Sequence, residues 1–143
     1  MLRKIKSTEK HLIVNDPVRP HIEFEWRVSN GREIYILEDD NTQEIKAVIC
    51  VAYTDEIPTN EDDMNNVGDK VAVFYTVWSH AKGAGRDIVF AVANHIKENK
   101  PKVVYYVTLS PLTDMARNFH IKNGAKFLNR HLDCQNFEYG IDN

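Results

Sequence analysis

The sequence predicts an α+β protein built on one mixed β-sheet, and three observations carry that prediction. Two β-branched and aromatic runs, at 32–39 and 45–54, flank the hairpin sequence DNTQE. A third apolar run, at 70–78, leads through a turn with two glycines into a segment of helical spacing. A fourth run, at 103–109, follows that segment and should lie parallel to the third, because a crossover helix joins parallel strands.

Length and composition bound the domain organisation and the function. A chain of 143 residues with 43% hydrophobic content suits a single domain spanning 1–143, in which 1–30 forms a less regular lead-in. The net charge of -3 disfavours a general nucleic-acid binder. Two cysteines without metal-ligand spacing, and the lack of a secretory or membrane-spanning run, favour a reduced, cytoplasmic protein that binds neither nucleic acid nor membrane.

The remaining elements follow from local patterns. The proline-containing lead-in has one short helix near 22–28, and 55–69 is a long acidic loop. The run at 70–78 shows little alternation, so it should be a central strand buried on both faces. A helix should cover 86–99, and a second should begin with Ser110 as N-cap and Pro111 as first residue and end at Gly124. A last strand lies in 127–132, in 135–141, or in both.

The two glycines precede the first of these helices, where a phosphate group is a natural ligand. Amide hydrogens at a helix start have no partner within the helix, and the helix dipole adds positive potential there. Gly83 and Gly85 leave this space free of side chains. A tight strand-to-helix turn has the same appearance, so the glycines alone leave both interpretations open.

Two longer stretches carry a family resemblance. HAKGAG, at 80–85, resembles the pyrophosphate loop Q/R-x-x-G-x-G/A of the GNAT superfamily of acyl-CoA-dependent acyltransferases, with His80 where Gln or Arg is common. ARNFHIKNGAKF, at 116–127, is similar to the signature A-x-x-[LF]-Y-x-x-x-G-F, with His120 replacing the tyrosine and Ala125 the last aromatic residue. The resemblance implies a GNAT-like domain with acetyl-CoA or another acyl-CoA as co-substrate, bound by the end of the third strand and by the loop: Val77, Trp78, His80, Ala81, Lys82, Gly83, Ala84, Gly85 and Arg86.

A narrower resemblance points to a different reaction. AVICVAYTDEI, AVFYTVWS, TLSP and NFHIKNGA occur in the same order as similar stretches of the malonyl-CoA decarboxylase catalytic domain, which has a GNAT fold. The serine and histidine of those enzymes map to Thr76 and His120, which are therefore the candidate catalytic residues. Those enzymes also carry a helical N-terminal domain, which this chain does not show before its catalytic fold.

The two reactions need similar groups. N-acyl transfer requires a deprotonated amine, a stabilised oxyanion and a protonated leaving thiolate, whereas decarboxylation requires a donor to the enolate oxygen and a proton for carbon. The stretch 71–78 contains no Asp or Glu that could act as a base, and this absence mildly favours decarboxylation. The number of transferases in the superfamily tilts the other way, so we expect an N-acyltransferase, with an acyl-CoA decarboxylase and a non-catalytic CoA binder as alternatives.

Each candidate residue has a structural alternative. His120 could be a buried histidine that packs the helix, and Thr76 is an ordinary strand residue. The acidic loop is interpreted as solvated, although it could attract a cationic amine. His131, Asp133 and Cys134 resemble a metal cluster only superficially, so no metal is expected. The acceptor, a small molecule or a protein, is not specified by the sequence, and homodimerisation is left open.

Overall fold

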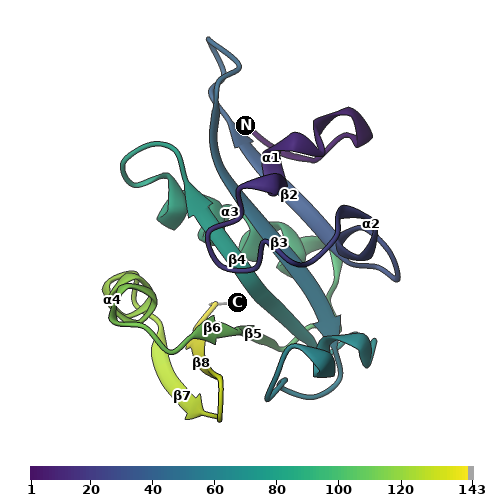
Figure 1. Ribbon diagram of the computed structural model, residues 1–143, viewed down its shortest axis with the longest axis vertical. Helices are drawn as coiled ribbons and strands as arrows, with labels where there is room; N and C mark the ends of the chain where they lie inside the picture. The colour runs from purple at the N-terminus through teal and green to yellow at the C-terminus, as the bar shows by residue number, and fades with distance from the viewer. Residues whose placement is uncertain (142–143) are drawn as a thin grey trace.

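The computed structural model describes residues 1–141 as an eight-stranded mixed sheet with helices on both faces (Figure 1). The strands lie in the order β1-β2-β3-β4-β5-β8-β6, and β7 pairs with the other edge of β8. Their bounds are β1 Leu2–Lys4, β2 Glu33–Glu38, β3 Ile45–Thr54, β4 Val71–Ser79, β5 Tyr105–Thr108, β6 Ser110–Pro111, β7 Lys126–Arg130 and β8 Cys134–Tyr139. The helices are α1 His11–Val14, α2 Phe24–Arg27, α3 Ala84–Asn99 and α4 Asp114–Lys122, with 3-10 turns η1 Ser7–Glu9 and η2 Asp62–Asn65.

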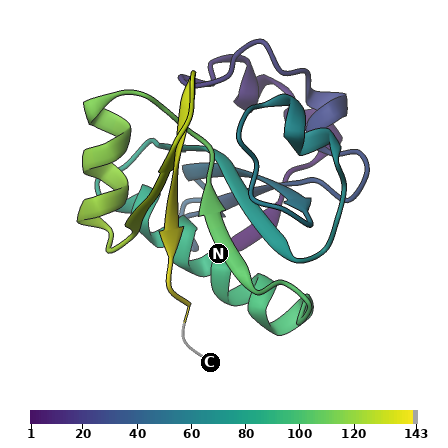
Figure 2. The ribbon, with the colours of Figure 1, turned by 90° about the horizontal axis from the view of Figure 1, so that it is seen from below.

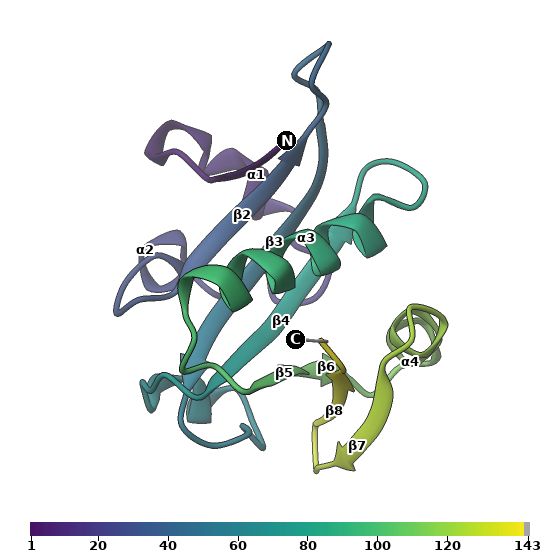
Figure 3. The ribbon, with the colours of Figure 1, turned by 180° about the vertical axis from the view of Figure 1, so that it is seen from behind.

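Strands β4 and β5 form the parallel pair of the described sheet, and they separate halfway along β4. Their register runs from Val71 opposite Tyr105 to Phe74 opposite Thr108. The last hydrogen bond across the pair joins the Leu109 amide to the Phe74 carbonyl at 3.2 Å. Beyond Phe74, β4 continues to Ser79 beside β3 alone, so the sheet opens between β4 and the β5–β8 half (Figure 3).

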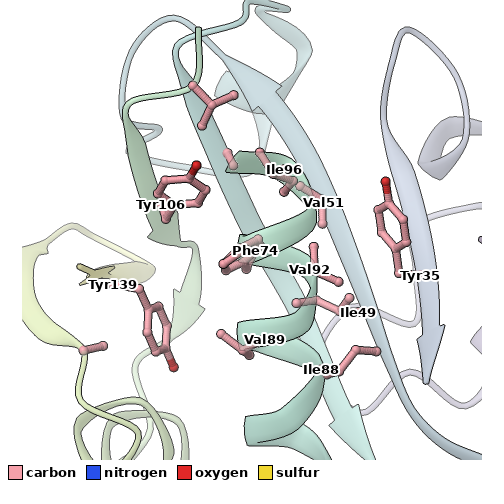
Figure 4. Close-up of a cluster of buried hydrophobic side chains, with 14 of the residues drawn as sticks. Tyr35, Ile49, Val51, Phe74, Ile88, Val89, Val92, Ile96, Tyr106 and Tyr139 are labelled. Atoms are coloured by element: carbon pink, nitrogen blue, oxygen red, sulfur yellow. The ribbon is translucent and has the colours of Figure 1, made fainter. Parts of the chain in front are cut away.

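The sheet has two different faces. Helix α3 lies across one face, where Ile88, Val89, Val92 and Ile96 are fully buried against β3 and β4 (Figure 4). The N-terminal segment with α1 and α2 lies on the other face (Figures 1 and 2). The turn η2 lies beside α2 on that face. We call the two faces the α3 face and the N-terminal face. Because β3 and β4 are covered on both sides, their residues are buried with little alternation.

Most sequence-based expectations are confirmed. The strands at 33–38, 45–54 and 71–79, the helix before 99 and the parallel strand at 105–108 appear as predicted, and both candidate C-terminal strands are present. Gly124 follows α4 with φ of 95°, the left-handed conformation of a helix C-cap. The single-domain prediction extended to 143, and its last two residues lie outside the described part of the chain.

One expectation about local structure was wrong. Ser110 and Pro111 form strand β6 against β8, and the helix begins later, with Thr113 as N-cap accepting from the Ala116 amide at 3.2 Å. The lead-in has the short helix expected near 22–28, as α2, and it is also joined to the sheet, because β1 extends the sheet and Asp16 and Arg27 are buried. Pairing partners and burial decide both cases, and neither is visible in local sequence. In residues 1–141, the helices lack the combined length and apolar character that crossing a bilayer would require.

Candidate functional site

The loop between β4 and α3 presents unpaired backbone amides. Within the described residues, the amides of Lys82, Gly83, Gly85 and Arg86 donate no hydrogen bond, whereas the Ala84 amide bonds to the Ala81 carbonyl at 3.1 Å. Gly83 has φ of 78°, a conformation that favours glycine, and a Cβ there would meet open space. Ser79 shapes the turn by donating its hydroxyl to the Ala81 carbonyl. Four free donors at the start of a 16-residue helix form a natural anion site.

Gly85 has a packing role besides its place in the loop. A Cβ at this position would lie 3.0 Å from the Phe119 ring of α4. The first turn of α3 therefore packs directly on α4, at the residue that precedes His120. Gly83 leaves the loop open, as the phosphate interpretation requires, and Gly85 lets the two helices approach, as the structural interpretation requires.

The other predicted loop residues have mixed environments. His80, Lys82 and Arg86 are exposed, and the Arg86 guanidinium lies 4.9 Å from the centre of the Phe90 ring. At the end of β4, Val77 packs toward the α3 face, whereas Trp78 is buried on the N-terminal face. The cationic side chains around the loop would add positive potential to that of the free amides.

Thr76 lies at an irregularity in β4. The register against β3 shifts between Cys50 and Val51, so Tyr75 is the extra residue of a bulge and Thr76 pairs with Cys50. Cross-strand partners point to the same face, and Cys50 belongs to the cluster on the N-terminal face. The Thr76 hydroxyl is buried without a hydrogen-bond partner among the described residues. It is a free donor where β4 has separated from β5.

His120 is buried on the other side of the sheet. Its ring stacks on Phe137 at 5.5 Å between centroids, and its Nδ1 lies 2.7 Å from the Tyr139 hydroxyl oxygen. Burial lowers the pKa of His120 to about 4, so the imidazole is neutral at pH 7. The direction of this bond depends on the ring tautomer, and we infer that Tyr139 donates its hydroxyl hydrogen to Nδ1, because a buried hydroxyl needs an acceptor. Nε2 then carries the hydrogen of the neutral ring and is available as a donor.

The structure does not join the two predicted catalytic residues directly. No hydrogen bond among residues 1–141 links Thr76 and His120, and they approach the opening of the sheet from the N-terminal face and the α3 face respectively. A substrate between β4 and α4 would have a hydroxyl on one side and an imidazole on the other. Their assignment as catalytic residues stays a prediction.

Sequence reasoning missed a buried polar cluster on the N-terminal face. Arg27 and Asp16 form a fully buried ion pair at 2.7 Å, and Arg27 also contacts the Cys50 sulfur at 3.4 Å. Arg19 and Arg32 are 6% and 4% exposed. Charged residues in a proline-containing segment are normally solvated. The available signal was three arginines spaced through a segment that also carries large apolar residues.

The acidic loop borders an open groove. His21, Glu23, Trp26, Glu61, Asp62 and Asn65, with Ile22, line a volume of about 460 Å³ between the α2 segment and η2. Two contacts cross it, from His21 Nε2 to Glu61 at 2.6 Å and from Trp26 Nε1 to Asn65 at 2.8 Å. The loop is thus partly structured and not simply solvated. Residues 1–141 contain no group of three or more His, Cys, Asp and Glu arranged to hold a metal ion.

Comparisons with known proteins bear on the fold. No family model matches the sequence, and no curated protein matches it. A GNAT family acetyltransferase from Listeria monocytogenes superposes with a TM-score of 0.71 at 11% identity, over 97% of this chain and 93% of that one. A GNAT family acetyltransferase from Elizabethkingia anophelis, solved with acetyl-CoA bound, gives 0.62 at 11% identity over 96% and 94%.

A decarboxylase also has a similar fold. The malonyl-CoA decarboxylase from Agrobacterium vitis superposes with a TM-score of 0.61 at 22% identity, over 83% of this chain. The match spans 35% of the decarboxylase, so most of that enzyme has no counterpart here. With the splayed β4–β5 pair and the free amides before α3, these likenesses show that the chain has a fold shared by GNAT family acetyltransferases and by part of a malonyl-CoA decarboxylase.

Proposed function

We propose that the protein binds an acyl-CoA and transfers its acyl group to an amine. The observation that carries the proposal is the set of four unpaired amides at Lys82, Gly83, Gly85 and Arg86, at the start of α3 and beside the opening of the sheet. A diphosphate would accept hydrogen bonds from these amides and gain from the helix dipole. The acetyl-CoA-bound acetyltransferase of the same fold supports this choice of ligand.

The opening between β4 and β5 would receive the rest of the co-substrate. Beyond Phe74, the β4 edge is free of its parallel neighbour, so an extended pantetheine arm has backbone groups to pair with. The thioester would then lie near Thr76 and His120. The Thr76 hydroxyl would donate to the carbonyl oxygen, and the neutral His120 would donate its Nε2 hydrogen toward the developing charge.

CoA binding is tested without reference to turnover. Thermal unfolding followed with CoA and with acetyl-CoA should show a rise in midpoint, because the ligand binds the folded state alone. Lys82→Glu places a negative charge beside the free amides and should weaken binding about tenfold or more. Lys70→Glu, an exposed substitution at the other end of β4, is the matched control. No shift with saturating CoA, or equal binding by both variants, would contradict the proposal.

Acyl-CoA decarboxylation is the second candidate, and a specific observation favours it. Strand β4 offers an unpaired hydroxyl at Thr76 and no carboxylate, and the low pKa of His120 suits a hydrogen-bond donor better than a base. Decarboxylation needs a donor to the enolate oxygen and no initial proton abstraction. The decarboxylase structures are 21% and 22% identical to the chain, somewhat above the 11% of the two acetyltransferases described.

One experiment separates the two reactions. The protein is incubated with malonyl-CoA alone, and separately with acetyl-CoA and a pool of amines. A transferase releases CoA only when an amine is present, whereas a decarboxylase converts malonyl-CoA to acetyl-CoA and carbon dioxide and keeps the thioester. We expect amine-dependent CoA release that falls about a hundredfold or more in His120→Ala. Rapid acceptor-free conversion of malonyl-CoA that depends on His120 would establish the decarboxylase instead.

A further inference from the structure

Buried donors without acceptors gather on the N-terminal face. Six buried side-chain atoms in residues 1–141 have no hydrogen-bond partner, and four of them are Arg19 Nε, Arg32 Nη1, the Tyr75 hydroxyl and the Thr76 hydroxyl. Folded proteins satisfy nearly all such atoms, because an unpaired buried donor costs free energy. Several at one place suggest a group that is missing from the protein alone.

Tyr75 connects these donors. Trp26, which stacks on the Arg32 guanidinium, also contacts the Tyr75 ring. Leu109, whose carbonyl accepts from Arg19, donates its amide to the carbonyl of Phe74, the residue before Tyr75. The Tyr75 hydroxyl lies near the Cys50 thiol but makes no hydrogen bond of normal geometry. Thr76 follows Tyr75 in the β4 bulge and pairs with Cys50. The unpaired donors therefore converge from β4 and the N-terminal segment on one region beside the opening of the sheet.

The charges in this region do not balance. Asp16 is the buried carboxylate of the cluster, and Arg27 already pairs with it at 2.7 Å. Arg32 donates to the Trp26 carbonyl and the Ser29 hydroxyl, both neutral acceptors. Arg19 donates Nη2 to the Leu109 carbonyl at 2.9 Å, and its Nε forms an ion pair with Glu61 at 3.8 Å, which is too long for a hydrogen bond. A buried cation that lacks an anion at hydrogen-bond distance is costly, and a ligand carboxylate would reduce that cost.

The open groove gives a route to these donors. Glu61 lines the groove and stands in front of Arg19, and Trp26 lines it and covers Arg32, whose guanidinium lies 3.9 Å from the centre of the indole ring. Trp26 also meets the Tyr75 ring edge-on at 5.7 Å between centroids. A shift of Trp26 and Glu61 would open the donors to a ligand in the groove.

We propose that Arg19, Arg32 and Tyr75 form a binding site for a carboxylate group of the substrate. The carboxylate accepts the Arg19 Nε, Arg32 Nη1 and Tyr75 hydroxyl hydrogens in place of the missing acceptors. It has two sources that share this chemistry: the distal carboxylate of an acyl group such as malonyl, or the carboxylate of an amino-acid acceptor. The identification of the substrate rests on the proposed acyl-CoA function, but the site itself does not.

Tyr75→Phe is the informative variant. It removes a hydroxyl that has no partner and keeps the ring that packs on Trp26, so it should fold normally. Tyr35→Phe is the matched control, because the Tyr35 hydroxyl is also buried without a hydrogen bond of normal geometry, but it faces Glu33 and belongs to the cluster on the α3 face. Thermal unfolding of each variant without ligand verifies that both are folded.

The experiment has three arms. In the first, sodium acetate is compared with sodium chloride at equal ionic strength, without CoA, by thermal unfolding and tryptophan fluorescence. In the second, the affinity for malonyl-CoA is compared with that for acetyl-CoA. In the third, glycine is compared with glycinamide in the presence of acetyl-CoA, because the amide retains the amine and lacks the carboxylate.

We expect acetate to stabilise the wild-type protein and Tyr35→Phe more than chloride does, and to lose this advantage in Tyr75→Phe. An affinity about tenfold higher for malonyl-CoA than for acetyl-CoA identifies the acyl group as the source of the carboxylate. The same preference for glycine over glycinamide identifies the acceptor as its source. If CoA fails to bind, the first arm still tests the site. The proposal is overturned if, in every arm, the compound with the carboxylate binds or stabilises the protein no better than the compound it is compared with. It is also overturned if Tyr75→Phe retains the preference for the carboxylate.

Discussion

The two faces of the sheet are stabilised in different ways. The α3 face is an apolar core in which Ile88, Val92 and Ile96 are fully buried against the central strands. The N-terminal face places a buried ion pair and two further arginines among its apolar residues. Apolar burial is non-directional and tolerant, whereas buried charges must find partners of correct geometry. The N-terminal face is therefore the one whose structure is most sensitive to single polar changes, and we expect substrate recognition there.

The largest expected loss of stability comes from disrupting the buried ion pair of the N-terminal face. Asp16→Asn preserves side-chain shape but removes the charge that faces Arg27, where both side chains are fully buried. Leaving one buried charge unpaired should lower the free energy of unfolding by about 3–5 kcal/mol. Urea denaturation at pH 7 measures this. Glu25→Gln, which breaks the exposed pair with Lys10, should change stability by less than about 1 kcal/mol. A small effect of Asp16→Asn would mean that the N-terminal face does not depend on its buried charges.

The next largest effect is the pH dependence of stability that arises from the buried histidine of the α3 face. Burial lowers the pKa of His120 to about 4 from an unfolded value of 6.5. Between these values the unfolded chain binds the proton and the folded chain does not, so stability falls as the pH is lowered from about 6.5 to 4. The loss should approach about 3 kcal/mol.

A variant separates this contribution from that of the carboxylates. His120→Gln should flatten the stability profile above about pH 4.5, measured by urea denaturation across the window. The pKa of Glu9, lowered to about 2 chiefly by the hydrogen bond from Arg3, gives acid sensitivity at lower pH instead. An unchanged profile in His120→Gln would place the source of the pH dependence elsewhere.

The smallest effect concerns the hydrogen bond between His120 and Tyr139. Tyr139→Phe leaves the buried Nδ1 without its donor, which should lower the free energy of unfolding by about 1–3 kcal/mol. Nitrogen NMR shifts of the His120 ring should show the Nε2–H form in the wild-type protein and a mixture in the variant. Tyr35→Phe removes a hydroxyl that faces Glu33 without a hydrogen bond of normal geometry, so it should have a smaller effect. Equal ring shifts in wild-type and variant proteins would show that Tyr139 does not fix the tautomer.

The sequence by itself determined the local elements and the loop. Apolar runs with β-branched residues fixed β2, β3 and β4, and helical spacing fixed α3, because burial patterns repeat with the period of each element. Gly83 was identifiable as the residue that opens the start of α3, since its role depends on its own backbone and not on distant partners.

The tertiary structure decided everything that depends on residues far apart in the chain. The contact of Gly85 with Phe119, the bond of His120 to Tyr139 and the pairing of Ser110 with β8 join segments whose approach no local pattern encodes. The buried arginines show this best. A charged residue in an irregular segment is normally solvated, and only the packing of that segment onto β3 and β4 removes the water and leaves Arg19 Nε and Arg32 Nη1 without acceptors.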